Sequence, residues 1–137
     1  MEIWSKPGIV ELPAYRDELG ALSVIEGESP FPFDIRRVYF LFDVPSHATR
    51  GSHAHKDLHQ LIIAVSGSFH VTLDDGRAAI DYFLDRPDRA LAVPPGYWRT
   101  LTGFSAGSTA LVLASHEYDP SDYIRDYDEF REWAAQR

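Results

Sequence analysis

The sequence predicts an all-β protein of one domain that ends in a short helix. Short apolar runs rich in β-branched and aromatic residues recur along the chain, and turn signals separate them about every 8–12 residues. This rhythm is typical of a β-sandwich or barrel. Helical periodicity is confined to the C-terminal end, and a length of 137 residues suits a single core.

The first part, residues 1–34, is predicted to be an irregular N-terminal segment. Prolines and glycines such as Pro7, Pro13 and Gly20 interrupt it and break up any longer pattern. Residues 21–25 are the one candidate strand in this part. The sequence leaves open whether that strand pairs with the edge of the barrel or with a second subunit.

Residues 35–118 carry the pattern of the barrel. In the first strand, residues 35–44, alternation places Arg37 and Tyr39 on one face and Phe40 and Phe42 on the other. A loop leads from there to an extended segment that contains two histidines. Further strands are expected over residues 61–65, 69–73, 78–84, 91–93, 97–101 and 109–115, with a hairpin turn at 74–77 and a sharp bend at 94–96.

The remaining residues, 119–137, are predicted to form a helical tail. Pro120 begins a turn or a helix, and the helical pattern starts at about Asp126 or Asp128. Tyr127, Phe130 and Trp133 recur at three-residue spacing. Such a stripe places the aromatic rings on one helix face, which we expect to pack against the barrel.

Composition excludes several classes of function. The formal net charge of -8 argues against a general nucleic-acid-binding protein, which needs a basic face. The chain has no cysteine, so no disulfide or thiolate chemistry is expected. We see neither a signal peptide nor an apolar run long enough to span a membrane, so a cytoplasmic location is expected.

The chemistry is expected to lie at His53 and His55. In a β-strand, residues two apart share a face, so both imidazoles point the same way. Three interpretations compete for such a pair: ligands of a transition metal, a general base with its partner, or two residues of a barrel wall. The flanking cations Arg50 and Lys56 favour a functional pair over a structural one.

The order of motifs resembles the two-motif pattern of cupins. The histidine pair is followed by Gln60 and Gly67, and then by a Pro-Pro-Gly turn before another strand. In metal-binding cupins, the first motif supplies two His and a Glu as metal ligands, and the second motif supplies a His. Here Gln60 stands in place of the Glu and Arg99 in place of the last His. Since Arg cannot coordinate a metal and Gln is a poor substitute for a carboxylate, we expect no metal.

Five separated motifs cover nearly the whole chain in order. They are Arg50-Gly51-x-His53-Ala54-His55-Lys56, Gly67-Ser68, Asp74-Asp75-Gly76, Pro95-Gly96-x-Trp98 and Tyr118-Asp119-x-x-Asp122-Tyr123-Ile124-Arg125-x-Tyr127. On these motifs the sequence is similar to the sugar 3,4-ketoisomerases of the WxcM-like family, metal-free cupins that act on thymidine-diphosphate-4-keto-6-deoxyglucose in deoxysugar biosynthesis. This resemblance implies a double-stranded β-helix (jelly-roll) barrel, a homodimer, and no cofactor.

Such an activity implies a role for each candidate residue. We expect His53 to be the main proton carrier, with His55 as its partner or as a hydrogen-bonding group for the sugar oxygens. By resemblance, Tyr39 faces the pair from the neighbouring strand, as a donor to the oxyanion or an acid at carbon 4. The remaining candidates bind substrate: Arg37, Arg50 and Arg99, with Lys56 nearby, for the diphosphate, Trp98 for stacking on the sugar or thymine, and Gln60 for a hydrogen bond to the sugar or a histidine.

Three other functions remain open at this point. The first is a nucleotide-sugar 3,5-epimerase, a metal-free cupin reaction that usually relies on a His–Asp dyad plus a Tyr. The second is a metal-dependent oxygenase or isomerase of the ordinary cupin type. The third is a sugar-binding cupin without catalytic activity. The sequence does not determine the configuration of the product at carbon 4.

Overall fold

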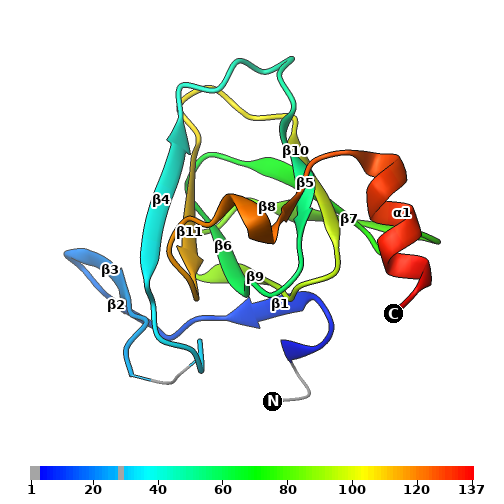
Figure 1. Cartoon of the computed structure of the whole chain (residues 1–137). Coiled ribbons are helices and arrows are strands. Elements are labelled where there is room, and N and C mark those ends of the chain that lie inside the picture. Colours follow the sequence, from blue (N-terminus) through cyan, green and yellow to red (C-terminus); the bar gives the residue numbers. More distant parts are fainter. Residues whose placement is uncertain (1–3, 28–29) are drawn as a thin grey trace.

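The structure, a computed structural model, describes residues 4–27 and 30–137. Its body consists of two five-stranded antiparallel sheets with a hydrophobic core between them (Figure 1). The first sheet has the order β1 (Gly8–Glu11), β9 (Arg89–Val93), β6 (Gln60–Ser66), β11 (Thr109–Ala114) and β4 (Arg37–Phe42). The second has the order β12 (Tyr123–Ile124), β5 (Arg50–His55), β10 (Trp98–Thr102), β7 (Phe69–Asp74) and β8 (Ala79–Leu84).

The core forms because apolar residues alternate along the strands. On β7, Phe69, Val71 and Leu73 are buried, whereas His70 and Thr72 point outward. Removing such side chains from water is the main favourable contribution to folding. The predicted all-β class with one C-terminal helix is confirmed.

The N-terminal part differs from its prediction. Within residues 4–27 the structure has three short strands where the sequence predicted an irregular course with one candidate strand, residues 21–25, which overlaps β3 (Gly20–Ser23). β1 pairs with β9 and extends the first sheet, and β2 (Ala14–Asp17) pairs with β3 in a hairpin that projects from the body (Figure 1). These strands have only four residues each, so they hold too few alternations to stand out between prolines and glycines.

Near the C-terminus, a 3-10 turn, Pro120–Asp122, precedes the two-residue strand β12 and the helix α1 (Tyr127–Ala135). The carboxylate of Asp126 caps the helix by accepting the N–H of Glu129 at 3.0 Å. Phe130 is fully buried against the sheet, as the aromatic stripe predicted. No helix in the described part of the chain has the length and apolar character that a membrane crossing requires.

The sequence analysis missed β12, which positions the site. It pairs antiparallel with β5 and places Tyr123 opposite His55 and Ile124 opposite Ala54. Two residues show no periodicity, so this strand left no pattern in the sequence. Its pairing brings residues from the C-terminal segment against the predicted histidine strand.

Candidate active site

A cavity of about 570 Å³ opens between the two sheets and takes its walls from several elements. β4, β5, β6 and β10 each contribute polar side chains to it, and the segment 118–125 closes one side. The structure therefore brings together residues that lie far apart in the sequence. Six of the nine predicted site residues line this cavity: Arg37, Tyr39, Arg50, His53, Gln60 and Arg99.

The two histidines share a face of β5, as strand alternation predicts. Their ring centroids are 4.9 Å apart and the rings are nearly perpendicular. His53 lines the cavity, whereas His55 is fully buried and contributes to a smaller, adjacent cavity of about 130 Å³. The structure thus places His55 behind His53 rather than beside it at the cavity wall.

The hydrogen bonding of His53 fixes its tautomer. Its Nδ1 lies 3.1 Å from the carbonyl oxygen of Gly51. A carbonyl only accepts hydrogen bonds, so Nδ1 carries the proton and Nε2 keeps its lone pair. Among the described residues, Nε2 of His53 has no hydrogen-bond partner. An unpaired acceptor of this kind is available to take a proton.

Burial keeps both histidines neutral. It lowers the pKa of His53 to about 4, and the nearby positive charge of Arg99 lowers it further in the same direction. Burial likewise lowers the pKa of His55, with the charges of Arg99 and His53 as secondary causes. At neutral pH, the imidazole of His53 is therefore in its basic form.

A buried hydrogen-bond chain links Arg99, Gln60 and Tyr39. Arg99 donates to the side-chain oxygen of Gln60, and the amide nitrogen of Gln60 donates to the hydroxyl of Tyr39 at 3.0 Å. Since the Tyr39 oxygen accepts this bond, its own proton is free to be donated. Burial raises the pKa of Tyr39, so the phenol stays protonated at neutral pH.

Arg99 lies almost completely buried in the cavity wall. Its exposed fraction is 2%, and burial lowers its pKa to about 10, which still leaves it positively charged. Its predicted contact with the diphosphate stays a prediction. Gln60 bonds to Arg99 and Tyr39, so the predicted bond from Gln60 to a histidine is not formed.

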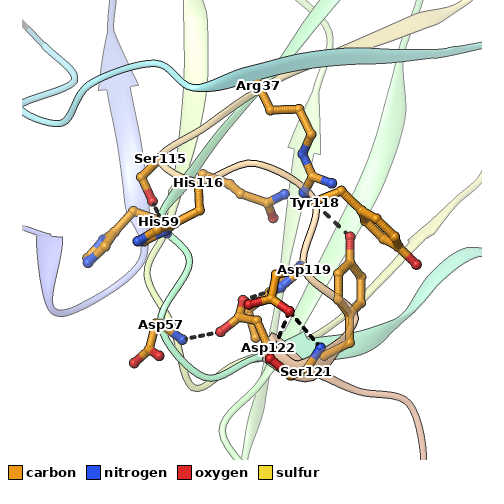
Figure 2. Close-up of polar contacts among 12 residues, drawn as sticks. Arg37, Asp57, His59, Ser115, His116, Tyr118, Asp119, Ser121 and Asp122 are labelled. Carbon is orange, nitrogen blue, oxygen red and sulfur yellow. Dashed lines mark hydrogen bonds and ion pairs between the residues drawn. The ribbon is translucent and has the colours of Figure 1, made fainter.

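The cavity also has a cationic, aromatic side that the sequence analysis missed. Arg37 lies 5.6 Å from the centre of the Tyr118 ring (Figure 2). Arg125 lies 4.1 Å from the centre of the Tyr123 ring. Arg37 also donates to the hydroxyl of Tyr123 at 3.4 Å. Tyr118, Tyr123 and Arg125 lie in the motif that carried the family resemblance, which was the one signal that could have identified them.

Besides His55, two further predicted site residues lie outside the cavity lining. Trp98 packs against the helix, with ring centroids 5.3 Å from Tyr127 and 5.9 Å from Phe130, and its stacking on the substrate stays a prediction. Lys56 is exposed and contributes to the smaller cavity instead. Alternation along a strand assigns Trp98 to one face of the sheet, but it does not show that the C-terminal helix covers that face.

His59 faces away from the cavity, where its ring stacks on Phe33 with centroids 4.1 Å apart. Gln60 therefore faces the interior and His59 does not, in agreement with their opposite strand parity. Within residues 4–27 and 30–137, no group of three or more His, Cys, Asp or Glu side chains is arranged to hold a metal ion.

A family model and a curated protein both match most of this chain. The family model FdtA, described as WxcM-like, C-terminal, matches residues 5–135. The TDP-4-oxo-6-deoxy-alpha-D-glucose-3,4-oxoisomerase of Aneurinibacillus thermoaerophilus is 43% identical over 119 residues, which cover 87% of this chain and 86% of that protein.

Solved structures agree. A mutant of the 3,4-ketoisomerase from Thermoanaerobacterium thermosaccharolyticum, in complex with TDP-4-keto-6-deoxyglucose, has a TM-score of 0.93 at 37% identity, covering 96% of this chain and 95% of that one. The TDP-quinovose 3,4-ketoisomerase from Campylobacter jejuni has a TM-score of 0.88 at 44% identity, covering 92% and 97%. By the match of its family model and by these relatives, the chain belongs to the FdtA, WxcM-like family of cupin-fold sugar 3,4-ketoisomerases.

Proposed function

We propose that this chain is a TDP-4-keto-6-deoxyglucose 3,4-ketoisomerase. The relative that is 43% identical over most of the chain has this activity by name. The structural observation that carries the proposal is a neutral His53 in the cavity wall, with an unpaired Nε2, together with a Tyr39 whose hydroxyl proton is free. A base and a donor in one cavity are what the isomerisation requires.

The reaction moves a ketone from carbon 4 of the sugar to carbon 3. His53 removes the proton from carbon 3, and the electron pair of that bond forms the double bond to carbon 4. The carbonyl oxygen on carbon 4 then becomes an enediolate oxygen, which Tyr39 protonates. In the second half, His53 delivers the proton that it holds to carbon 4, and the hydroxyl on carbon 3 gives its proton back to Tyr39, which leaves the new carbonyl.

Arg99 stabilises the charge that develops. It is a buried cation, and a charge in a site shielded from water acts more strongly than one at the surface. Its bond to Gln60, and the bond from Gln60 to Tyr39, also polarise the phenol, since linked hydrogen bonds strengthen one another. Tyr39 thereby becomes a better donor to the enediolate.

The diphosphate is assigned to the arginines of the cavity. Arg37 and Arg50 were predicted for this role, and Arg125 joins them from the C-terminal segment. Because the whole chain carries a net charge of -8, an anionic substrate needs such a local group of cations. Guanidinium groups bind phosphate oxygens through two hydrogen bonds at once. The recognition of thymine stays a prediction.

One observation favours a 3,5-epimerase as the second candidate. His55 and Asp122 form a His–Asp pair with 2.9 Å between Nδ1 and Oδ2, and Tyr39 is available in the adjoining cavity. A dTDP-4-dehydrorhamnose 3,5-epimerase from Bacillus anthracis has a TM-score of 0.76. Its identity of 15% shows a shared fold only.

The two activities differ in the sugar carbon that reacts, so a proton NMR time course with TDP-4-keto-6-deoxyglucose in deuterated water separates them. We expect the signals of a 3-keto isomer to replace those of the substrate. Deuterium at carbon 5 with the ketone still at carbon 4 would indicate an epimerase. An unchanged substrate spectrum would indicate a binding protein.

A homodimer and a cytoplasmic location complete the proposal. β4 lies at the edge of the first sheet, and the outward residues Val38, Phe40 and Phe42 are 52%, 56% and 60% exposed. An apolar face along a free strand edge is the kind of surface on which a second copy of a chain docks. The cytoplasmic location rests on the sequence expectation alone.

A further inference from the structure

The carboxylate of Asp122 lies against the ring of His55, behind the cavity that holds His53. Its Oδ2 is 2.9 Å from Nδ1 of His55, and its Oδ1 accepts the backbone N–H of Asp57 at 2.7 Å. The backbone carbonyl of Asp122 accepts the N–H of Lys56 at 3.0 Å. Two bonds to the carboxylate and one to the backbone, all from the consecutive residues His55, Lys56 and Asp57, hold Asp122 in place.

The local fold of the C-terminal segment explains this placement. Asp119 caps the turn by accepting the backbone N–H of Ser121 at 3.0 Å and its hydroxyl at 2.7 Å (Figure 2). Asp122 ends that turn, and the next residue, Tyr123, pairs with His55 across β12 and β5. The register of this two-residue strand therefore sets Asp122 beside the histidine.

The contact determines which nitrogen of His55 carries the proton. An ionised carboxylate only accepts hydrogen bonds, so the proton lies on Nδ1 and Nε2 keeps its lone pair. Nε2 is buried and has no partner among the residues that the structure describes. Buried polar atoms without a partner are uncommon and often belong to sites of chemistry.

The reaction gives this lone pair a use. His53 carries a positive charge while it holds the proton from carbon 3. A lone pair on the adjacent ring, 4.9 Å away between centroids, favours that charge, whereas a proton on the same atom would oppose it. His55 therefore acts on the sugar through His53 and does not contact it.

We infer that Asp122 is a positioning residue of the ketoisomerase, which holds the proton of His55 on Nδ1 and so keeps Nε2 of His55 as an acceptor next to His53. An amide at this position can donate to Nδ1 and would favour the opposite tautomer. The effect on catalysis rests on the proposed function. The tautomer of His55 does not depend on it.

The test combines nitrogen NMR with kinetics on the wild type and Asp122→Asn. In protein labelled with ¹⁵N-histidine, the His55 signals are assigned by their loss in His55→Gln. We expect Nδ1 of His55 to be protonated in the wild type and Nε2 in Asp122→Asn. We expect kcat to fall about 100-fold, within the range for loss of acid–base function, with KM nearly unchanged.

Asp119→Ala is the matched control. It removes the side-chain cap of the same turn, but the pairing of β12 with β5 and the bonds of Asp122 to Lys56 and Asp57 remain, so we expect the wild-type tautomer and kcat. A wild-type spectrum with the His55 proton on Nε2 would overturn the inference, even if Asp122→Asn fails to fold. So would an Asp122→Asn protein with unchanged tautomer and kcat. If neither the wild type nor a variant isomerises the sugar, the proposed function is wrong. The NMR measurement of the His55 tautomer still decides whether Asp122 holds the proton on Nδ1.

Discussion

At the scale of single residues, His53 shows how a fold adjusts a base. Burial and the charge of Arg99 both disfavour the imidazolium and bring the pKa of His53 to about 4. The carbonyl of Gly51 opposes them and fixes the tautomer. The result is a histidine that is neutral throughout the physiological range and presents an unpaired nitrogen.

His53→Asn should lower kcat by about 100- to 10,000-fold, because asparagine cannot accept and return a proton at neutral pH. Initial rates of 3-keto product formation, followed by proton NMR, measure the effect. His47→Asn is the control, since His47 is exposed and lies outside the cavity lining. If His53→Asn retains most of the wild-type turnover, His53 is not the base.

The pH dependence should follow the lowered pKa of His53. The neutral form is the active one, so kcat/KM should be constant from about pH 8 to pH 5 and fall as the pH drops through about 4. The same shift makes the fold less stable as the pH falls from 6.5 to about 4, because only the unfolded chain binds the proton in that window.

Initial rates between pH 4 and 8 test this, with circular dichroism at each pH to confirm that the protein remains folded. A fall in kcat/KM centred near 6.5, the ordinary pKa of histidine, would contradict the assigned environment.

The sequence predicted part of this site. Alternation put the two histidines on one face of their strand, because residues two apart share a face whatever the rest of the fold does. That Tyr39 faces them came only from the family resemblance, and its strand, β4, proves to lie in the opposite sheet and not beside β5. Alternation could not place Trp98, since the helix that covers it lies elsewhere in the chain. It also gave no role to Asp122 or Arg125. These two residues flank β12, which has only two residues and so shows no periodicity in the sequence.

At the scale of elements, the turn between β6 and β7 depends on Gly67. Its φ is +66°, a conformation that glycine adopts without cost. A Cβ at this position would lie 2.5 Å from Oγ of Ser105 and 2.6 Å from Cβ of Ser108. Both the backbone angle and the close approach of the neighbouring loop therefore require glycine here.

Gly67→Ala should destabilise the fold more than Gly107→Ala does. Gly107 has a similar φ of +73°, but a Cβ there would meet nothing within 4 Å, so only the cost of the left-handed conformation applies, about 1–2 kcal/mol. At Gly67 the crowding should add about 1–3 kcal/mol. Urea unfolding measures both, and equal losses would show that the loop moves aside freely.

The elements themselves were predicted unequally well. Strands of five to seven residues, such as β6, β7 and β10, appeared as apolar runs or alternations because their buried faces are long enough to show a pattern. The helix appeared through its aromatic spacing. β1 and β12 depend on partners distant in sequence for their formation, and no local pattern records such partners.

At the scale of the whole molecule, two features point beyond the single chain. The net charge of the chain is -8, so it does not attract an anionic ligand as a whole. The positive charge that attracts such a ligand is provided locally by the arginines of the cavity. On the opposite side of β4, the outward aromatic rings of Phe40 and Phe42 lie 5.9 Å apart and are exposed. That face has the character of a subunit contact.

Phe40→Glu should convert a dimer into a monomer, because burying an unpaired charge in an apolar contact is costly. Size-exclusion chromatography with light scattering measures the mass in solution. Ile80→Glu is the matched control, since Ile80 is similarly exposed, at 55%, but lies on β8 in the other sheet. A monomeric wild type, or a Phe40→Glu protein that remains dimeric, would contradict the proposed interface.

The pairing of β12 with β5 also bears on how the enzyme is made. The ribosome releases the chain from its N-terminus, so the strands that carry His53, Gln60 and Arg99 emerge before residues 118–125. Until translation passes those residues, the nascent cavity lacks one wall and His55 lacks its carboxylate. Activity is therefore acquired late in synthesis, after most of the β-core is already available to fold.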